Sequence, residues 1–223
     1  EPGSVAAAAL AEGAAGLARF RLELMRPIQA MLASPAEDMT TAMADLERAG
    51  LEYKLDGARV QIHRVGRDVR IFTRQLHDVT ARLPEVVEAV RACAADTLIL
   101  DGEVIALTPE DRPLPFQVTM RRFGRKTDVE EMRGKLPLTA FLFDCLHRDG
   151  EDLIDRPGAA RSEALVAVAA PARLVPRIVT ADADEAQAFL ARALAEGHEG
   201  VMAKSLTAPY AAGSRGADWL KVK

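Results

Sequence analysis

The sequence predicts an α+β fold of mainly antiparallel sheets with helices packed outside them. Short runs of alternating apolar and polar residues recur along the chain, and segments with helical spacing lie between them. Residues 138–146, LTAFLFDCL, are nearly all apolar, which is typical of a strand buried on both faces. These strands are more numerous than one meander needs, so we expect sheets with intervening helices rather than a simple β fold.

The first part of the chain alternates helix and strand signals. Residues 5–24 are rich in Ala and Leu after Ser4 and predict a helix, while Pro27 opens an extended connector over 26–33. Residues 36–49 predict a helix that Gly50 ends. Asp56-Gly57 separates residues 51–55 from the alternating run 58–63, and this pair between two such runs is the strongest short hairpin signal. We therefore expect two strands to meet there.

The remaining elements follow from the same signals. Residues 69–73 predict a strand, and residues 84–94 predict a helix because valines recur at helical spacing after Pro84. A second Asp-Gly pair, at 101–102, predicts that residues 97–107 form two strands joined by a turn. Further helices are expected over 117–123, 159–168 and 184–196, the last capped by Gly197, and further strands over 138–146, 174–179, 200–204 and 219–223.

Composition excludes several classes of protein. The 223 residues are 49% hydrophobic and 28% charged, which suits one globular domain or two small lobes. No apolar run approaches the roughly 18 residues of a membrane helix, so we expect no membrane partner. Cys93 and Cys145 are the only cysteines, so we expect neither a disulfide scaffold nor a zinc site. We expect the protein to work in a reducing cytoplasm. The net charge of -4 argues against a dedicated DNA-binding module but allows a local basic face.

The segment EYKLDGAR, residues 52–59, groups a nucleophile, a turn and a fixed cation. Lys54 would lie at a strand end beside a tight turn, where the backbone can approach a phosphate closely. The pKa of a lysine falls readily on burial or beside other cations, and this makes lysine usable as a nucleophile. Arg59 could be such a cation while also binding a ligand. An Asp-Gly turn with a nearby lysine is also common on protein surfaces. The choice between a reaction site and a surface turn therefore depends on the other segments.

Other segments place polar or aromatic groups near strand ends. They are Arg74 in TRQLHDVT, Glu103 in LDGEVIA, Phe143 in FLFDCLH, Glu199 in GHEGVMAK, and Lys221 and Lys223 in WLKVK. Each group has a structural alternative as a turn cap, a core aromatic or a solvated charge. The four histidines are scattered without metal-ligand spacing, and we interpret them as structural or surface residues.

In this order, the segments closely resemble the nucleotidyltransferase motifs of ATP-dependent DNA ligases, over residues 26–223. FQVTMRRFGRK and APYAAGSRG also resemble the bacterial and archaeal subgroup. The resemblance implies a ligase adenylation domain over 26–223, ATP-grasp-like, with two mainly antiparallel β-sheets and flanking helices. Residues 1–25 would be the remnant of a preceding DNA-binding region or a linker helix. We expect the C-terminal oligonucleotide-binding barrel of such ligases to be absent from this chain.

The resemblance also implies a reaction, in which Lys54 attacks the α-phosphate of ATP to form lysyl-AMP and release pyrophosphate. AMP then passes to the 5′-phosphate of a DNA nick, which the 3′-hydroxyl seals. By resemblance, Glu52 lies at the adenine edge and Phe143 stacks on adenine. Arg59 and Arg74 bind nucleotide or nick phosphates, and Glu103 binds ribose. Glu103 and Glu199 hold Mg²⁺, and the further nucleotide-binding cations are Arg215, Lys221 and Lys223. Such transfer needs positioned cations and a divalent metal on one or two carboxylates, which agrees with these residue types.

The expected partner is nicked double-stranded DNA, bound by a monomer in replication, repair or recombination. We expect a local DNA contact in the basic cluster Arg121, Arg122, Arg125 and Lys126, with a solvated loop as the alternative. Two other functions remain open at this point. One is an RNA ligase or mRNA-capping guanylyltransferase, which shares the Lys-x-Asp-Gly core, and the other is a non-catalytic nucleotide- or DNA-binding module.

Overall fold

The computed structural model describes residues 10–11, 22–170 and 173–223. The helix expected over 5–24 therefore lies mostly outside the described residues. Within the described part of the chain, no helix has both the length and the apolar character to cross a membrane.

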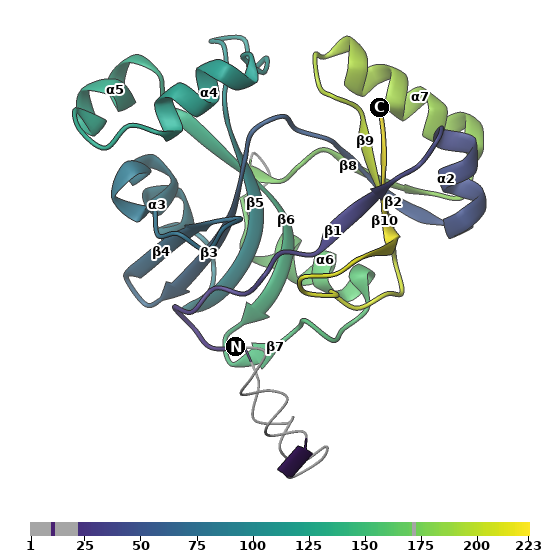
Figure 1. The fold of residues 1–223 in the computed structure, drawn as a ribbon, viewed down its shortest axis with the longest axis horizontal. Coiled ribbons are helices and arrows are strands. Elements are labelled where there is room, and N and C mark those ends of the chain that lie inside the picture. Colours follow the sequence, from purple (N-terminus) through teal and green to yellow (C-terminus); the bar gives the residue numbers. More distant parts are fainter. Residues whose placement is uncertain (1–9, 12–21, 171–172) are drawn as a thin grey trace.

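Two five-stranded sheets form the centre of the molecule, which confirms the α+β prediction (Figure 1). The first sheet has the order β1-β10-β9-β2-β8, from Leu32–Pro35, Arg215–Val222, Val201–Ser205, Ala49–Tyr53 and Arg177–Thr180. The second sheet has the order β4-β3-β5-β6-β7, from Asp68–Thr73, Ala58–Val65, Thr97–Ala106, Leu138–Arg148 and Glu151–Asp152. Neighbouring strands are antiparallel except β1 and β10.

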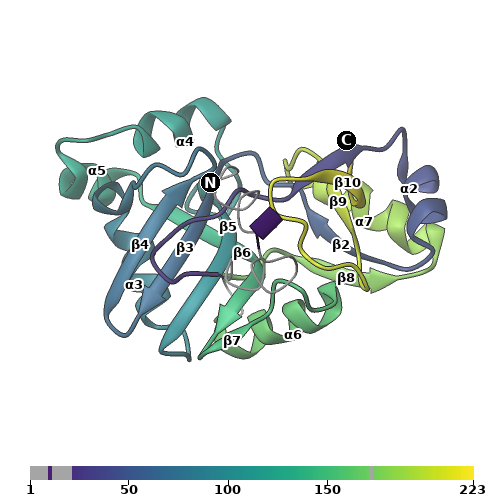
Figure 2. The same cartoon turned by 60° about the horizontal axis from the view of Figure 1, so that its bottom comes forward.

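Helices cover the two sheets separately, as Figure 2 shows from another side. The first sheet carries α2 (Met39–Leu46) and α7 (Ala183–Ala195), which also contact each other. The second sheet carries α3 (Pro84–Arg91), α4 (Phe116–Phe123) and α6 (Gly158–Val168), with α5 (Val129–Lys135) and the short 3₁₀ helix Thr80–Arg82 beside them. The strands that carry the expected motifs are divided between the two sheets.

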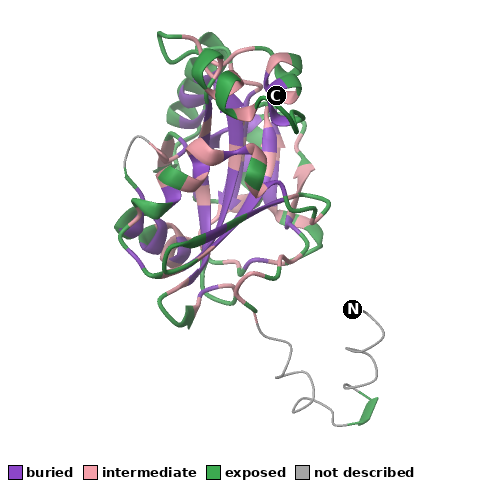
Figure 3. Ribbon diagram, turned by 90° about the vertical axis from the view of Figure 1, so that its left-hand side faces the viewer, coloured by how far each residue is buried: buried purple, intermediate pink, exposed green. Residues whose placement is uncertain are grey.

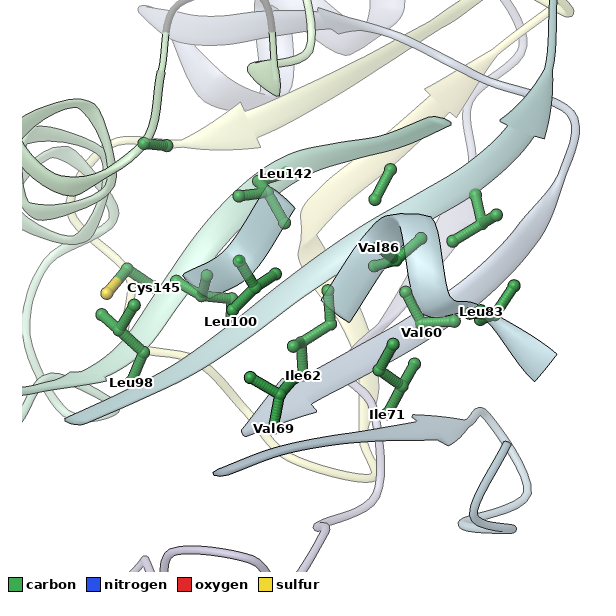
Figure 4. Packing of buried hydrophobic residues seen from close by; sticks show 14 of the residues in the cluster. Val60, Ile62, Val69, Ile71, Leu83, Val86, Leu98, Leu100, Leu142 and Cys145 are labelled. Atoms are coloured by element: carbon green, nitrogen blue, oxygen red, sulfur yellow. The ribbon is translucent and has the colours of Figure 1, made fainter. Parts of the chain in front are cut away.

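Each sheet has its own apolar core. In the second sheet, alternate residues of β3, β4 and β5 pack with α3 and α6, including the fully buried Val60, Ile62 and Ile71 (Figure 4). In the first sheet, α2 and α7 pack on β2, β9 and β10. Buried residues follow the strands, whereas exposed residues lie on helices and loops (Figure 3). A third, smaller cluster joins the two sheets, with Ile99 of β5 and Leu146 of β6 packed with Trp219 of β10.

The hairpin predicted at Asp56-Gly57 is wrong. β2 pairs with β8 and β9 in the first sheet, whereas β3 pairs with β4 and β5 in the second. All of β2 is buried because it is paired on both edges, and this long-range pairing overrides the local turn signal. The segment 54–57 instead crosses between sheets, and a Cβ at Gly57 would lie 2.3 Å from the Val104 carbonyl oxygen.

The turn predicted at Asp101-Gly102 is also wrong. β5 runs without interruption through both residues, and its register against β6 shifts between them. A Cβ at Gly102 would lie 2.9 Å from the Phe141 carbonyl oxygen, so glycine permits a close strand approach at a bulge.

Smaller corrections concern the ends of elements. The helix expected over 36–49 is limited to α2, because Glu47 has a positive φ of 56° and Gly50 belongs to β2. The connector expected over 26–33 becomes strand β1 at Leu32, which pairs with β10. The other expected helices and strands form within a few residues of their predicted bounds, while α5 and β7 were not predicted.

Candidate active site

A cavity of about 380 Å³ lies at the junction of the two sheets, within the size range of small-molecule sites. Residues from β2, β3, β5, β6, β9, β10 and α4 line it, together with the crossover 54–57 and the end of β4. The expected site residues among them are Glu52, Lys54, Arg59, Arg74, Glu103 and Phe143. Segments far apart in sequence therefore converge on one cavity.

Backbone hydrogen bonds fix Lys54 at the end of β2. Its N–H donates to the Gly200 carbonyl at 2.8 Å, and the Glu199 N–H donates to the Lys54 carbonyl at 3.1 Å. These bonds extend the β2–β9 ladder, in which Tyr53 pairs with Val201. Lys54 and Glu199 thus face each other because their strands are neighbours.

The pKa of Lys54 is lowered overall, although its ion pair with Glu199 favours the charged ammonium. Its side chain is 19% exposed and forms an ion pair with Glu199, whose second oxygen accepts from Lys223 Nζ at 2.6 Å. Burial lowers the pKa of Lys54, and the Lys223 and Lys221 charges lower it further, against the opposing charges of Glu103 and Asp56. A lysine with a lowered pKa is a candidate nucleophile.

Glu103 contributes a buried carboxyl to the same cavity. Burial raises its pKa to about 8, against the opposing charges of Arg59 and Lys54. A divalent cation would remove this penalty, and carboxylate oxygens are ligands that Mg²⁺ accepts. In the described part of the chain, no cluster of three or more His, Cys, Asp and Glu residues could hold a metal. The donor set fits an ion held by one or two carboxylates with phosphate and water oxygens.

Arg59 is held in a buried network that the sequence did not reveal. Its Nε donates to Asp101 Oδ1 at 3.1 Å, its second terminal nitrogen to Asp101 Oδ2 at 2.5 Å, and the other terminal nitrogen to the Met31 carbonyl at 2.7 Å. The Tyr210 hydroxyl donates to the same Asp101 at 2.7 Å. The guanidinium is therefore fixed in orientation, with its central carbon 5.4 Å from the Phe143 ring centre.

Aromatic and charged groups meet beside Arg59. Phe143 and Trp219 lie edge to face with ring centres 6.2 Å apart. Lys204 Nζ is 4.5 Å from the Phe143 ring centre and 2.5 Å from Glu52 Oε2. Sequence reasoning missed Lys204, although it is the last residue of GHEGVMAK. Met202, on the same strand, also lines the cavity.

The other expected cations lie in different places. Arg74 is exposed and lines the cavity at the end of β4. Lys221 lies in β10 and Lys223 directly follows it, and neither lines the cavity. Their charges lower the pKa of Lys54. Arg215 is exposed, donates to the Ala33 carbonyl, and does not line the cavity.

The basic cluster expected at 121–126 needs one correction. Arg122 is fully buried and donates to the Arg82 carbonyl at 3.0 Å and to Glu85 Oε1 at 2.9 Å, so it is a structural residue. Arg121, Arg125 and Lys126 are exposed and remain available to a ligand.

Comparisons with known proteins identify the family of this chain. The family model of the ATP dependent DNA ligase domain matches residues 30–223. A "Probable DNA ligase" of Anaeromyxobacter sp. (strain Fw109-5) is 61% identical over 98% of this chain and 42% of that protein. A "Probable DNA ligase" of Sorangium cellulosum (strain So ce56) is 56% identical over 98% of this chain and 41% of that protein. The chain thus spans less than half the length of these relatives.

Solved structures share the fold. The ligase domain from M. tuberculosis LigD is 26% identical with a TM-score of 0.66, over 87% of this chain and 60% of that chain. A mycobacterial DNA ligase D complexed with ATP and MES is 25% identical with a TM-score of 0.65, over 88% of this chain and 60% of that chain. From the family match over nearly the whole chain and the close relatives, the chain belongs to the ATP-dependent DNA ligase domain family.

Proposed function

We propose that this chain is the adenylation domain of an ATP-dependent DNA ligase. The observation that carries the proposal is Lys54, a partly buried lysine of lowered pKa that lines the cavity with Glu103 and forms an ion pair with Glu199, which lies outside the lining residues. Lys54 Nζ, once deprotonated, attacks the α-phosphorus of ATP, the bond from that phosphorus to the bridging oxygen breaks, and pyrophosphate leaves. The product is AMP joined to Lys54 through a P–N bond.

The other residues position the nucleotide. Phe143 offers a ring face for the adenine base, and Glu52 offers a carboxylate to its edge. Arg59 and Arg74 contribute positive charge to the ribose and phosphate end, together with Lys221, Lys223 and Arg215. Glu103 and Glu199 would hold Mg²⁺, which when bound neutralises charge on the phosphates. Glu199 must then exchange its lysine contacts for the metal.

The later steps belong to the whole ligase and are part of the proposal. AMP passes from Lys54 to the 5′-phosphate of a nick in duplex DNA, and the 3′-hydroxyl displaces AMP to seal it. Exposed cations near the cavity, such as Arg121 and Arg125, would contact DNA phosphates. We also propose that the protein works as a monomer in the cytoplasm. The chain spans less than half the length of its curated relatives, and we expect the rest of such a ligase to supply further phosphate contacts.

Labelled ATP tests the proposal. With magnesium present, label from the α-phosphate should become attached to the protein, whereas label from the γ-phosphate should not. Addition of excess pyrophosphate should remove the attached label, and a chelator should prevent its attachment. In the full-length ligase, the attached label should pass to nicked DNA and not to nicked RNA. Attachment of γ-label, or label attached equally from GTP, would contradict an ATP-dependent ligase.

A further inference from the structure

Glu52 lies between two cations that come from neighbouring strands. It is buried in β2, which lies between β9 and the edge strand β8, with 4% of its surface exposed, and it lines the cavity beside Phe143. On one side, Lys204 Nζ of β9 is 2.5 Å from Oε2. On the other side, Arg177 Nε of β8 is 3.4 Å from Oε1. Both strands pair with β2, so the sheet itself fixes this arrangement.

A hydrogen bond holds the guanidinium end of Arg177. One terminal nitrogen donates to Ser162 Oγ of α6 at 2.6 Å, and α6 packs on β6, the strand that carries Phe143. The guanidinium also lies against Gly50, where an added Cβ would be 2.5 Å from the other terminal nitrogen. The absence of a side chain at Gly50 therefore gives Arg177 its position. Arg177 itself does not line the cavity.

The two oxygens of Glu52 are held differently. Oε2 is within hydrogen-bond distance of Lys204, whereas Arg177 Nε is buried and makes no hydrogen bond within the described residues. The Arg177 charge thus attracts Oε1 without donating a hydrogen bond to it. Burial raises the pKa of Glu52, the Lys204 and Arg177 charges oppose that rise, and Asp144 adds to it. Both cations favour the ionised carboxylate, which only accepts hydrogen bonds.

We propose that Arg177 is a positioning residue for base selection, which orients Glu52 so that Oε1 accepts a hydrogen bond from the 6-amino group of adenine. A purine with an oxygen at position 6 would place two acceptors together and lose this bond. The inference rests on the proposed function, because it requires an adenine nucleotide in the cavity. The base preference then depends on Arg177, which does not line the cavity.

The test compares binding of AMP and IMP, which differ at position 6 and cannot adenylate the protein. The chain is first treated with pyrophosphate to remove any lysine-bound AMP, and affinities are measured by calorimetry. The wild type should prefer AMP by about tenfold or more, as expected for a hydrogen bond to a charged acceptor. Arg177→Met should reduce the preference to about threefold or less, mainly by weakening AMP binding.

Two further variants separate positioning from a general loss of structure. Gly50→Ala keeps the Arg177 charge but forces its guanidinium to move, so it should also lower the AMP preference, even if Arg177→Met fails to fold. Arg70→Met removes an exposed arginine of β4 and should leave the preference unchanged.

The outcomes of this test are distinct. A preference retained in folded Arg177→Met would overturn the inference, as would a preference retained in Gly50→Ala if Arg177→Met fails to fold. An equal loss of AMP and IMP binding in folded variants would also overturn it. A wild type that binds AMP and IMP equally would overturn it as well, since Glu52 would then not select the base. A wild type that binds neither AMP nor ATP would instead overturn the proposed function of the cavity.

Discussion

Replacing Arg122 by methionine tests the buried ion pair that removes this residue from the expected DNA-binding cluster. Arg122 has no exposed surface, and it links α4 to the Arg82 carbonyl and to Glu85, whose side chain is only 10% exposed. The same Glu85 oxygen accepts from the Leu138 N–H at 3.0 Å. Arg122→Met leaves a buried carboxylate without its cation, and such a change costs about 3–5 kcal/mol.

The free energy of unfolding, measured by urea denaturation, should fall by this amount. For a domain of this size, the midpoint of thermal unfolding should fall by about 6–20 °C, from about 2–4 °C per kcal/mol. The exposed neighbour provides the matched control, because Arg121→Met should change stability by less than about 0.5 kcal/mol. The double variant Arg122→Met, Glu85→Gln should recover about half the loss or more, since the amide that replaces the carboxylate is neutral and can still accept from the Leu138 N–H.

Equal stability of the Arg122→Met and Arg121→Met variants would refute the buried ion pair. A double variant no more stable than Arg122→Met would show that the cost does not come from the stranded Glu85 carboxylate.

Three other predictions follow from the cavity and its supports. Glu103 has a pKa raised to about 8, so its stabilising contribution is full below about pH 4.5 and is lost as pH rises through 8. The midpoint of thermal unfolding of Glu103→Gln should lack this loss. Parallel pH profiles of the wild type and Glu103→Gln would contradict this prediction. Tyr210→Phe removes the hydroxyl that donates to Asp101 and should lower the free energy of unfolding by about 1–3 kcal/mol in urea; no change would deny the network a structural role. Lys223→Met removes a charge that lowers the Lys54 pKa, so the pH profile of adenylation should shift to higher pH, and an unshifted profile would count against this coupling.

Much of the fold could be predicted from sequence because local periodicity reports burial. The helices α3, α4, α6 and α7 and the strand β6 lie close to their predicted bounds. The helices α3, α4 and α7 each have an apolar stripe, and β6 is a nearly continuous apolar run. The two Asp-Gly predictions failed for a shared reason. Gly57 and Gly102 serve close approach of another backbone, and sequence alone does not distinguish this use of glycine from a turn.

The residues of the candidate site were predictable only where they belong to one of the quoted motifs. Lys54, Glu103 and Phe143 fall in the quoted segments, and the fold brings them to one cavity. Asp101 and Tyr210 were missed because their hydrogen bond joins residues 109 positions apart. Arg177 was missed because its role depends on the pairing of β8 with β2.

Arg122 was misassigned because a basic run in sequence does not show which side chains face inward. It lies on the same helix as the exposed Arg121, and only packing against Glu85 separates the two.

The most direct test of the proposed reaction is the mass of the intact protein after incubation with ATP and Mg²⁺, followed by peptide mapping. The wild type should gain the mass of one AMP, the adduct should be labile to acid, and the modified peptide should carry it on Lys54. The Lys54→Ala variant, shown to be folded by its circular dichroism spectrum, should gain no mass. An AMP adduct on another residue, or an equal adduct on Lys54→Ala, would contradict Lys54 as the nucleophile.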